Sequence, residues 1–399
     1  MNYESAYLVN ILKCFIAGGN PEPFQGDWSK LFQLANIHSV IGILGYTVMS
    51  HPKEFNSQVL PPMRSQCLQT IALQTIALQT VRAGSMARLM EKMNAEGIDH
   101  LLFKGYVLKD YYAVPELRTY GDIDFLIHPE DREKSDSLMM QEGFQRKTDW
   151  EPVYSYYKQE EFYEIHTDVM EVDVSDKADY KGYFQHIWEH AHLVSGHTYE
   201  LSPEYHFLYI LTHIAKHISG SGAGIRMYMD IAVFIQHFGE KLDWDYVQKE
   251  LEALSFTDFS NMVLTVVRDY FGVDSPFPLK EIAQQVKEEF MEYTMEGGVF
   301  GHFGRDAGLV SLKQQDRNEE ENVSRSKTIF RRLFAPASEL EKRYTYLQGR
   351  HWLYPVAWVQ RLIKTRDSLD AHVKEAQSIM HTETEEVLKL KRIYKEIGL

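Results

Sequence analysis

The chain has 399 residues, of which 44% are hydrophobic and 13% aromatic, enough to bury a substantial core in two or three domains. Its 57 acidic and 42 basic residues give a formal net charge of -15, which disfavours a nucleic-acid partner because binding a phosphate backbone needs clustered Lys and Arg. Only Cys14 and Cys67 are present, too few for a disulfide framework. No apolar run is long enough to span a membrane and no secretion signal opens the chain, so we expect a cytoplasmic protein.

The first 60 or so residues predict helices. In the stretch DWSKLFQLANIHSV, apolar residues follow a possible capping residue, Asp27, at helical spacing. After the break LPPMRS, a long and mostly buried helix is expected from Gln66 to about Glu96. It contains the duplicated pentad TIALQTIALQT, but five residues match neither a helical turn nor a heptad, so this is not a repeat fold.

Strands and helices alternate from Gly97 to about residue 175. The pattern predicts a strand in IDHLLFKG, a helix in YVLKDYY, a second strand in GDIDFLIHPED and a helix over residues 130 to 142. The stretch FYEIHTDVMEVDV alternates enough for one or two further strands. This order of elements predicts a small sheet with helices packed against it.

From residue 200 onward the pattern is helical again. Ser202 and Pro203 are suited to the first positions of a helix that continues through HFLYILTHIAKHIS. We therefore expect an α+β protein with a small mixed-sheet core, flanked by helical regions at both ends. The expected regions are residues 1–65 (helical), 66–200 (core) and 201–399 (helical).

Two aspartates one residue apart, Asp122 and Asp124, open the apolar strand GDIDFLI. Residues i and i+2 of a strand share a face, about 6.6 Å apart. Two carboxylates that are desolvated side by side need a cation, and their oxygen atoms suit Mg²⁺. Without further evidence, two aspartates at this spacing more often belong to a polar turn that faces water. A third acid on a later strand would complete a two-metal site. The periodicity fits both Glu164 and Asp173.

Residues near this strand could hold phosphate. Lys104 and Gly105 lie between the first strand and a helix, where glycine allows a ligand to approach the backbone and free amide groups favour an anion. Arg118 precedes Asp122 by four residues and could bind phosphate oxygens, or could form a salt bridge to another carboxylate.

These features together resemble the DNA polymerase beta-type nucleotidyltransferase superfamily. More narrowly, LLFKGYVLKDYY followed by LRTYGDIDFLI looks like a bacterial family of uncharacterised nucleotidyltransferase-like proteins, in which Lys-Gly replaces the usual Gly-Ser or Gly-Gly. The acid-apolar-His signature of that family matches Glu164, Ile165 and His166, which favours Glu164 over Asp173 as the third acid. The resemblance covers most of the chain.

The resemblance implies an enzyme that uses Mg²⁺ or Mn²⁺ and an NTP donor such as ATP. The nucleotide would pass to a hydroxyl of a small molecule or a protein, with pyrophosphate leaving. Asp122, Asp124 and Glu164 would bind the metal and carry catalysis. The residues implied to contact the nucleotide are Lys104, Gly105, Arg118, His166, His213, His217, Arg226 and Asp230. Lys104 stands where the superfamily has a small residue, which implies a triphosphate pocket or a mode of nucleotide binding that differs from the usual one in the superfamily.

Three histidines, His206, His213 and His217, fall on one face of the helix after Pro203. The spacing HIAKH lacks the glutamate of a zinc protease motif, so metal binding is the least favoured role. Core histidines paired with Asp230 are the ordinary interpretation, and a contact to the acceptor or nucleotide is the alternative that the resemblance supports.

Two other functions remain open on sequence alone. The same fold could be a non-catalytic scaffold that binds a nucleotide or a partner. A DxD glycosyltransferase is less favoured, because its sheet should be larger than the two strands expected before residue 128. The acceptor, the preferred base and the oligomeric state do not follow from the sequence.

Overall fold

The computed structural model describes residues 1–150, 152–170, 174–175, 177–220, 222–299 and 301, and shorter segments from 312 to 399. The chain forms two compact units, Met1–Phe303 with Ile397–Leu399, and Gly304–Glu396.

Four helices form the N-terminal part, as expected. The side chains of Asn2 and Asp27 accept hydrogen bonds from the amides of the first helical turns, so α1 and α2 begin at capped positions. The long helix ends where Gly97 adopts a left-handed conformation, with φ of 64°. The bounds are α1 (Tyr3–Ala17), α2 (Trp28–Ile37), α3 (Ile41–Ser50) and α4 (Pro62–Glu96).

A mixed sheet of seven strands, in the order β3-β4-β5-β2-β1-β7-β6, forms the core and confirms the α+β fold. Strand β2 pairs in parallel with β5 and antiparallel with β1, and β1 pairs in parallel with β7. The bounds are β1 (His100–Leu102), β2 (Ile123–Ile127), β3 (Gln145–Trp150), β4 (Val153–Lys158), β5 (Glu161–His166), β6 (Ala191–Ser195) and β7 (Thr198–Leu201). The hairpin of β6 and β7 was not expected, because β6 is mostly exposed and lacks a buried alternating pattern.

Helices connect and cover these strands. The helix expected in YVLKDYY is only the four-residue α5, continued by a short 3₁₀ turn at Lys109–Tyr111. Pro203 opens α8 as expected, but the Ser202 side chain makes no capping hydrogen bond. The helices of the first unit after β1 are α5 (Gly105–Leu108), α6 (Arg132–Gln141), α7 (Tyr180–Phe184), α8 (Pro203–Ser219), α9 (Ile225–Phe238), α10 (Trp244–Ala253), α11 (Thr257–Val266) and α12 (Gln284–Glu296). Described helices of the second unit are α14 (Arg325–Leu333), α16 (Tyr354–Lys364) and α18 (Thr384–Glu396).

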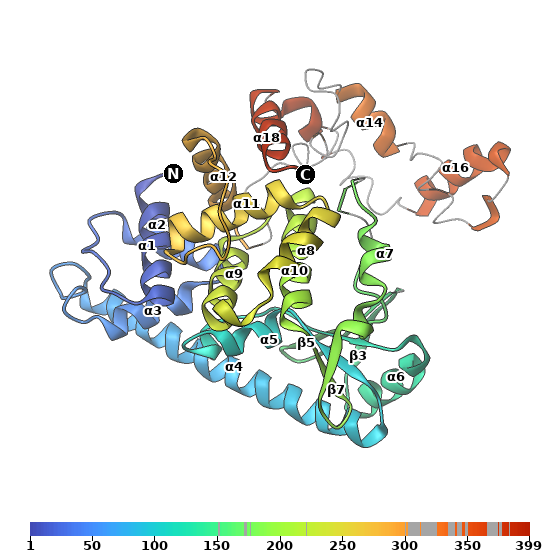
Figure 1. Ribbon diagram of the computed structural model, residues 1–399, viewed down its shortest axis with the longest axis horizontal. Coiled ribbons are helices and arrows are strands. Elements are labelled where there is room, and N and C mark those ends of the chain that lie inside the picture. The colour runs from blue at the N-terminus through green and yellow to red at the C-terminus, as the bar shows by residue number, and fades with distance from the viewer. Residues whose placement is uncertain are drawn as a thin grey trace. The chain divides into compact units, whose positions relative to one another are not determined.

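The two faces of the sheet differ in chemistry. On one face, Ile123, Phe125 and Ile127 pack with residues of α4 and α6 in a single buried cluster. The alternate residues of β2 and β5, which include Asp124 and Glu164, point to the other face. Figure 1 shows α4 along one side of the sheet, with α8 and α9 on the other. Because successive side chains of a strand point to opposite faces, the sheet has one apolar face and one polar face.

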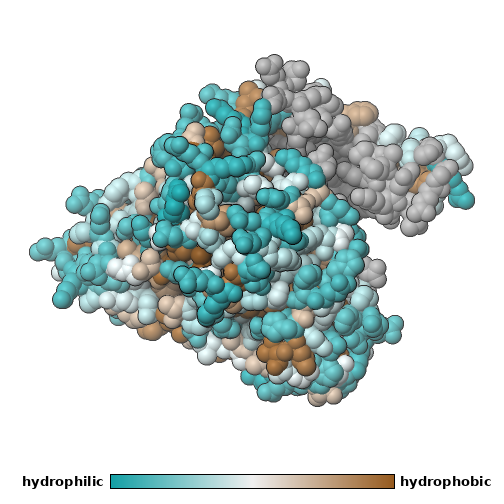
Figure 2. Space-filling view, viewed as in Figure 1, coloured by the Kyte–Doolittle hydropathy of each residue, from teal (hydrophilic) through white to brown (hydrophobic). Residues whose placement is uncertain are grey.

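None of the helices in the described part of the chain is both long enough and apolar enough to cross a bilayer. Although α4 has 35 residues, its sequence mixes many polar residues with the apolar ones. The face of the molecule in Figure 2 is mostly hydrophilic, with only small hydrophobic patches.

Helices α3 and α4 approach closely at Gly45. A Cβ atom at this position would lie 2.1 Å from the backbone oxygen of Leu68 and 3.1 Å from the Cβ of Ala72. Such a contact with backbone cannot be relieved by rotating a side chain. The absence of a side chain at Gly45 therefore permits this helix packing.

We predict that Gly45→Ala lowers the free energy of unfolding by about 1–3 kcal/mol, because α3 and α4 must separate. Gly84→Ala is the matched control within α4, since its Cβ would meet only the Arg88 side chain, at 3.7 Å. That change should stabilise the helix by about 0.5–1 kcal/mol. Urea unfolding of both variants tests this, and equal effects would contradict the proposed close packing.

Candidate functional site

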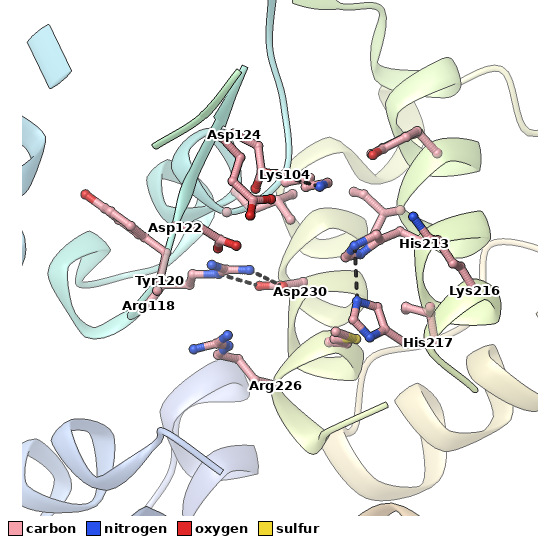
Figure 3. A pocket seen from close by; sticks show the side chains of 18 of the residues that line it. Lys104, Arg118, Tyr120, Asp122, Asp124, His213, Lys216, His217, Arg226 and Asp230 are labelled. Atoms are coloured by element: carbon pink, nitrogen blue, oxygen red, sulfur yellow. Dashed lines mark hydrogen bonds and ion pairs between the residues drawn. The ribbon is translucent and has the colours of Figure 1, made fainter. Parts of the chain in front are cut away.

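A cavity of about 340 Å³ lies where the polar face of the sheet meets α8 and α9 (Figure 3). Every residue expected from the sequence to bind a metal or contact a nucleotide lines it. These residues are Lys104, Gly105, Arg118, Asp122, Asp124, Glu164, His166, His213, His217, Arg226 and Asp230. Residues up to 126 positions apart in the chain, from Lys104 to Asp230, therefore surround one space.

The acidic residues come from two neighbouring strands. Asp124 of β2 and Glu164 of β5 are direct partners in the parallel register, so their side chains share a face of the sheet. Together with His166 they form a group whose candidate ligand atoms lie within 4.8 Å of one another. Asp122 immediately precedes β2 and lines the same cavity, outside this group. The alternative third acid, Asp173, lies outside the described residues.

Asp124 is buried and already has two partners. Its Oδ1 accepts a hydrogen bond from the Lys104 ammonium at 2.8 Å and lies 2.9 Å from Nε2 of His166. Burial alone would raise the pKa of Asp124, but the Lys104 charge and the His166 contact hold it well below its usual range. Asp124 is therefore an ionised carboxylate at neutral pH. Burial and the nearby Asp124 charge raise the pKa of Asp122.

The turn before α5 brings Lys104 to this carboxylate. Lys104 has a positive φ of 60°, and Gly105 follows as the first residue of α5. A Cβ at Gly105 would lie 2.2 Å from Nη1 of Arg118, so the space beside the glycine is occupied by that guanidinium. Glycine is required here for a close approach, and the approaching group is a side chain of the protein.

Arg118, in the β1–β2 connection, forms a buried, bidentate ion pair with Asp230 of α9 (Figure 3). Nη2 of Arg118 lies 2.6 Å from one carboxylate oxygen and Nε lies 3.1 Å from the other. The hydroxyl of Tyr112 donates to the same carboxylate at 2.7 Å. The hydrogen bonds described for Asp230 thus come from Arg118 and Tyr112, whereas the sequence suggested histidines.

Arg226 supplies a second guanidinium beside Arg118. Its Nη1 donates to the backbone oxygen and the hydroxyl of Thr119, at 2.7 and 3.0 Å, and its buried Nε has no hydrogen-bond partner in the described structure. Burial and the neighbouring Arg118 charge lower the pKa of Arg226 to about 10, so it stays positive at neutral pH. Arg118 already holds Asp230, whereas Arg226 donates only to Thr119 among the described residues, which favours the binding of an anion.

The histidines of α8 divide into two kinds. His213 and His217 line the cavity and approach one another through their Nε2 atoms at 3.2 Å (Figure 3). Burial and the nearby His217 hold the pKa of His213 well below its usual value. His206 is buried against Phe234 and does not line the cavity. A structural role therefore fits His206, whereas His213 and His217 can meet a ligand.

Arg82 of α4 supports the site but was not predicted from the sequence. Its guanidinium donates to the backbone oxygens of Tyr120 and Gly121, the two residues before Asp122. It therefore supports the turn that presents Asp122 to the cavity. The available signal was helical spacing with Met86 and Leu89, which places Arg82 on the buried face of the helix.

We predict that Asp230→Ala lowers the free energy of unfolding by about 3–5 kcal/mol, because it leaves the buried Arg118 charge without its partner. Asp258→Ala, which removes an exposed partner of Lys280, should cost less than about 1 kcal/mol. Chemical denaturation of the two variants measures the difference. Equal losses would show that the buried pair contributes no more than a surface pair.

Comparison with known proteins gives a family and no individual relative. No curated protein and no solved structure matches the chain. A family model described as "uncharacterised nucleotidyltransferase" matches residues 25–272, which include α2, the complete sheet and every residue that lines the cavity. Since this match covers more than half of the chain, the protein belongs to this family of nucleotidyltransferases.

Proposed function

We propose that the protein is a Mg²⁺-dependent nucleotidyltransferase that moves a nucleoside monophosphate from an NTP to a hydroxyl of a small molecule or a protein. ATP is the donor that we would test first, and pyrophosphate is the product that leaves. The acids on adjacent strands, next to a strand-turn-helix unit, also support a relation to the DNA polymerase beta-type superfamily. Two free thiols, Cys14 and Cys67, fit the reducing environment of the cytoplasm, where we propose that it acts.

One observation carries this proposal. Asp124 and Glu164 are register partners on parallel strands and open into a cavity whose helical wall holds Arg226. A purely structural sheet gains nothing from two carboxylates at adjacent positions on one face. The acids of the sheet face Arg226 across the cavity. This arrangement matches a substrate that combines a metal cation with a phosphate chain.

The residues present fit a divalent metal. Asp124 and Glu164 offer carboxylate oxygens, which suit Mg²⁺ and Mn²⁺, and His166 lies within the same group of candidate ligands. Asp122 lines the cavity nearby and would complete the acid set. When bound, the metal would neutralise charge on the phosphate oxygens and favour ionisation of the acceptor hydroxyl.

The side chains of the protein would bind and orient the reactants. Arg226 is charged and lines the cavity, so its guanidinium can donate to phosphate oxygens from the helical wall. His213 and His217 can donate or accept hydrogen bonds beside it. The pair of Arg118 and Asp230 holds α9 against the β1–β2 connection, so Asp230 acts by positioning Arg118. Such positioning and charge neutralisation account for most of the catalysis in phosphoryl transfer.

A non-catalytic scaffold is the second candidate, and the ion pair of Lys104 with Asp124 favours it. A lysine that permanently neutralises a metal-binding acid would leave a nucleotide-binding fold without chemistry. Membership of this nucleotidyltransferase family argues against a glycosyltransferase, but it does not distinguish the enzyme from the scaffold. Metal-dependent nucleotide binding separates the enzyme from the scaffold.

We predict that at least one of ATP, GTP, CTP and UTP binds the wild-type protein in the presence of Mg²⁺. The Asp122→Ala/Asp124→Ala variant should bind it about 100-fold more weakly or not at all, because two acids of the metal site are lost. Calorimetric titration with and without Mg²⁺ measures both effects. Circular dichroism shows whether the variant is folded.

The matched control is Glu240→Ala/Asp245→Ala, which removes two exposed acids that do not line the cavity. Its nucleotide affinity should equal that of the wild type, so a change in overall charge cannot explain the effect. If none of the four nucleotides binds the folded wild-type protein with Mg²⁺, the proposal that an NTP is the donor is wrong.

A further inference from the structure

Lys104 occupies a backbone conformation that suits glycine. Its φ of 60° and ψ of -140° lie in a region that residues with a Cβ seldom adopt. Such a conformation costs on the order of 1–3 kcal/mol for a non-glycine residue, and glycine would avoid that cost. The turn between β1 and α5 therefore does not account for the lysine. The explanation must come from what its side chain contacts.

The side chain reaches the candidate metal group. Its Nζ lies 2.8 Å from Oδ1 of Asp124, and only 19% of the side chain is exposed. His166 lies 2.9 Å from the same oxygen. A divalent cation bound to Asp124 would lie close to this ammonium, and two positive charges at that distance repel strongly in a buried site. The lysine and the metal therefore compete for one carboxylate.

An ammonium that leaves Asp124 needs another anion. A charge that is mostly buried and unpaired is costly, so Lys104 will not leave readily into an empty cavity. The cavity is large enough for a phosphate chain, and phosphate oxygens are suitable partners for a lysine. A phosphate chain can thus take over the lysine while a metal takes over the aspartate.

We propose that Lys104 is the resident counter-ion of Asp124 and couples metal binding to polyphosphate binding. Metal alone binds weakly because Lys104 competes for Asp124, and a polyphosphate withdraws Lys104 so that the metal can bind. The inference rests on the proposed function only for the identity of the anion. Because such coupling is reciprocal, release of Lys104 from Asp124 must also strengthen metal-free polyphosphate binding.

The first test measures binding of Mn²⁺ alone, by the electron paramagnetic resonance signal of free Mn²⁺. Lys104→Met should raise the Mn²⁺ affinity about 10-fold over wild type, within the range usual for coupled sites. Lys104→Gly, which also relieves the backbone, should behave in the same way and covers the case in which Lys104→Met does not fold. Lys109→Met is the control, since Lys109 pairs with Asp110 and does not line the cavity.

The second test titrates inorganic triphosphate in EDTA by calorimetry. Asp124→Asn should bind it about 10-fold more tightly than wild type, because Lys104 becomes available. Asp122→Asn removes a carboxylate from the same cavity without releasing the lysine, so its gain should be smaller. The double variant Lys104→Met/Asp124→Asn should lose the gain.

Equal Mn²⁺ affinities in wild type and both Lys104 variants would overturn the proposal, as would no Mn²⁺ binding to those variants. A gain in triphosphate affinity that persists in the double variant would overturn it too. Failure of the proposed function has a different signature. In that case wild type binds none of the four nucleotides with Mg²⁺, while the Mn²⁺ and triphosphate effects of Lys104 remain.

Discussion

The arrangement of the cavity depends on keeping carboxylates ionised in a buried place. Asp124 and Asp230 are 6% and 3% exposed, and each would be unstable as an isolated anion. Each is matched by a cation from a different element, Lys104 from the turn before α5 and Arg118 from the β1–β2 connection. The first ion pair holds the turn against β2, and the second holds the β1–β2 connection against α9. The residues that hold the fold at this point are therefore the same residues that define its chemistry.

The register of two strands explains why the acids meet. Asp124 and Glu164 are separated by a helix and two strands in sequence, and the parallel pairing of β2 with β5 brings them side by side. The alternate residues, Phe125 and Ile165, point to the opposite face and join the cluster packed on α4 and α6. A shift of either strand by one residue would bury the acids among apolar side chains, so the apolar face strongly specifies the register that forms the site.

Sequence patterns predicted the parts of the site that are local. Local patterns pointed to the turn at Lys104 and Gly105 and to the pair Asp122 and Asp124, and these four residues line the cavity. Periodicity left Glu164 and Asp173 open, and it was the resemblance to the family that pointed to Glu164 and His166, which line the cavity as well. Contacts between residues that lie far apart in the sequence could not be predicted from local patterns. Arg82 meets the Tyr120 and Gly121 carbonyls from 38 and 39 residues away, and Tyr112 meets Asp230 from 118 residues away. Periodicity reports which face of a helix is buried, but it does not report what that face meets.

The distribution of charge over the cavity indicates what kind of ligand completes it. Its lining contains four acidic and four basic side chains, and three of the acids, Asp122, Asp124 and Glu164, come from the sheet side. The helical wall contributes Lys216 and Arg226. Because Asp230 is held by Arg118, Arg226 has no carboxylate partner among the described residues. A simple cation would satisfy only the sheet side, and a simple anion would satisfy only the helical wall. A ligand that presents a cation to one side and a polyanion to the other, as a metal-bound phosphate chain does, satisfies both.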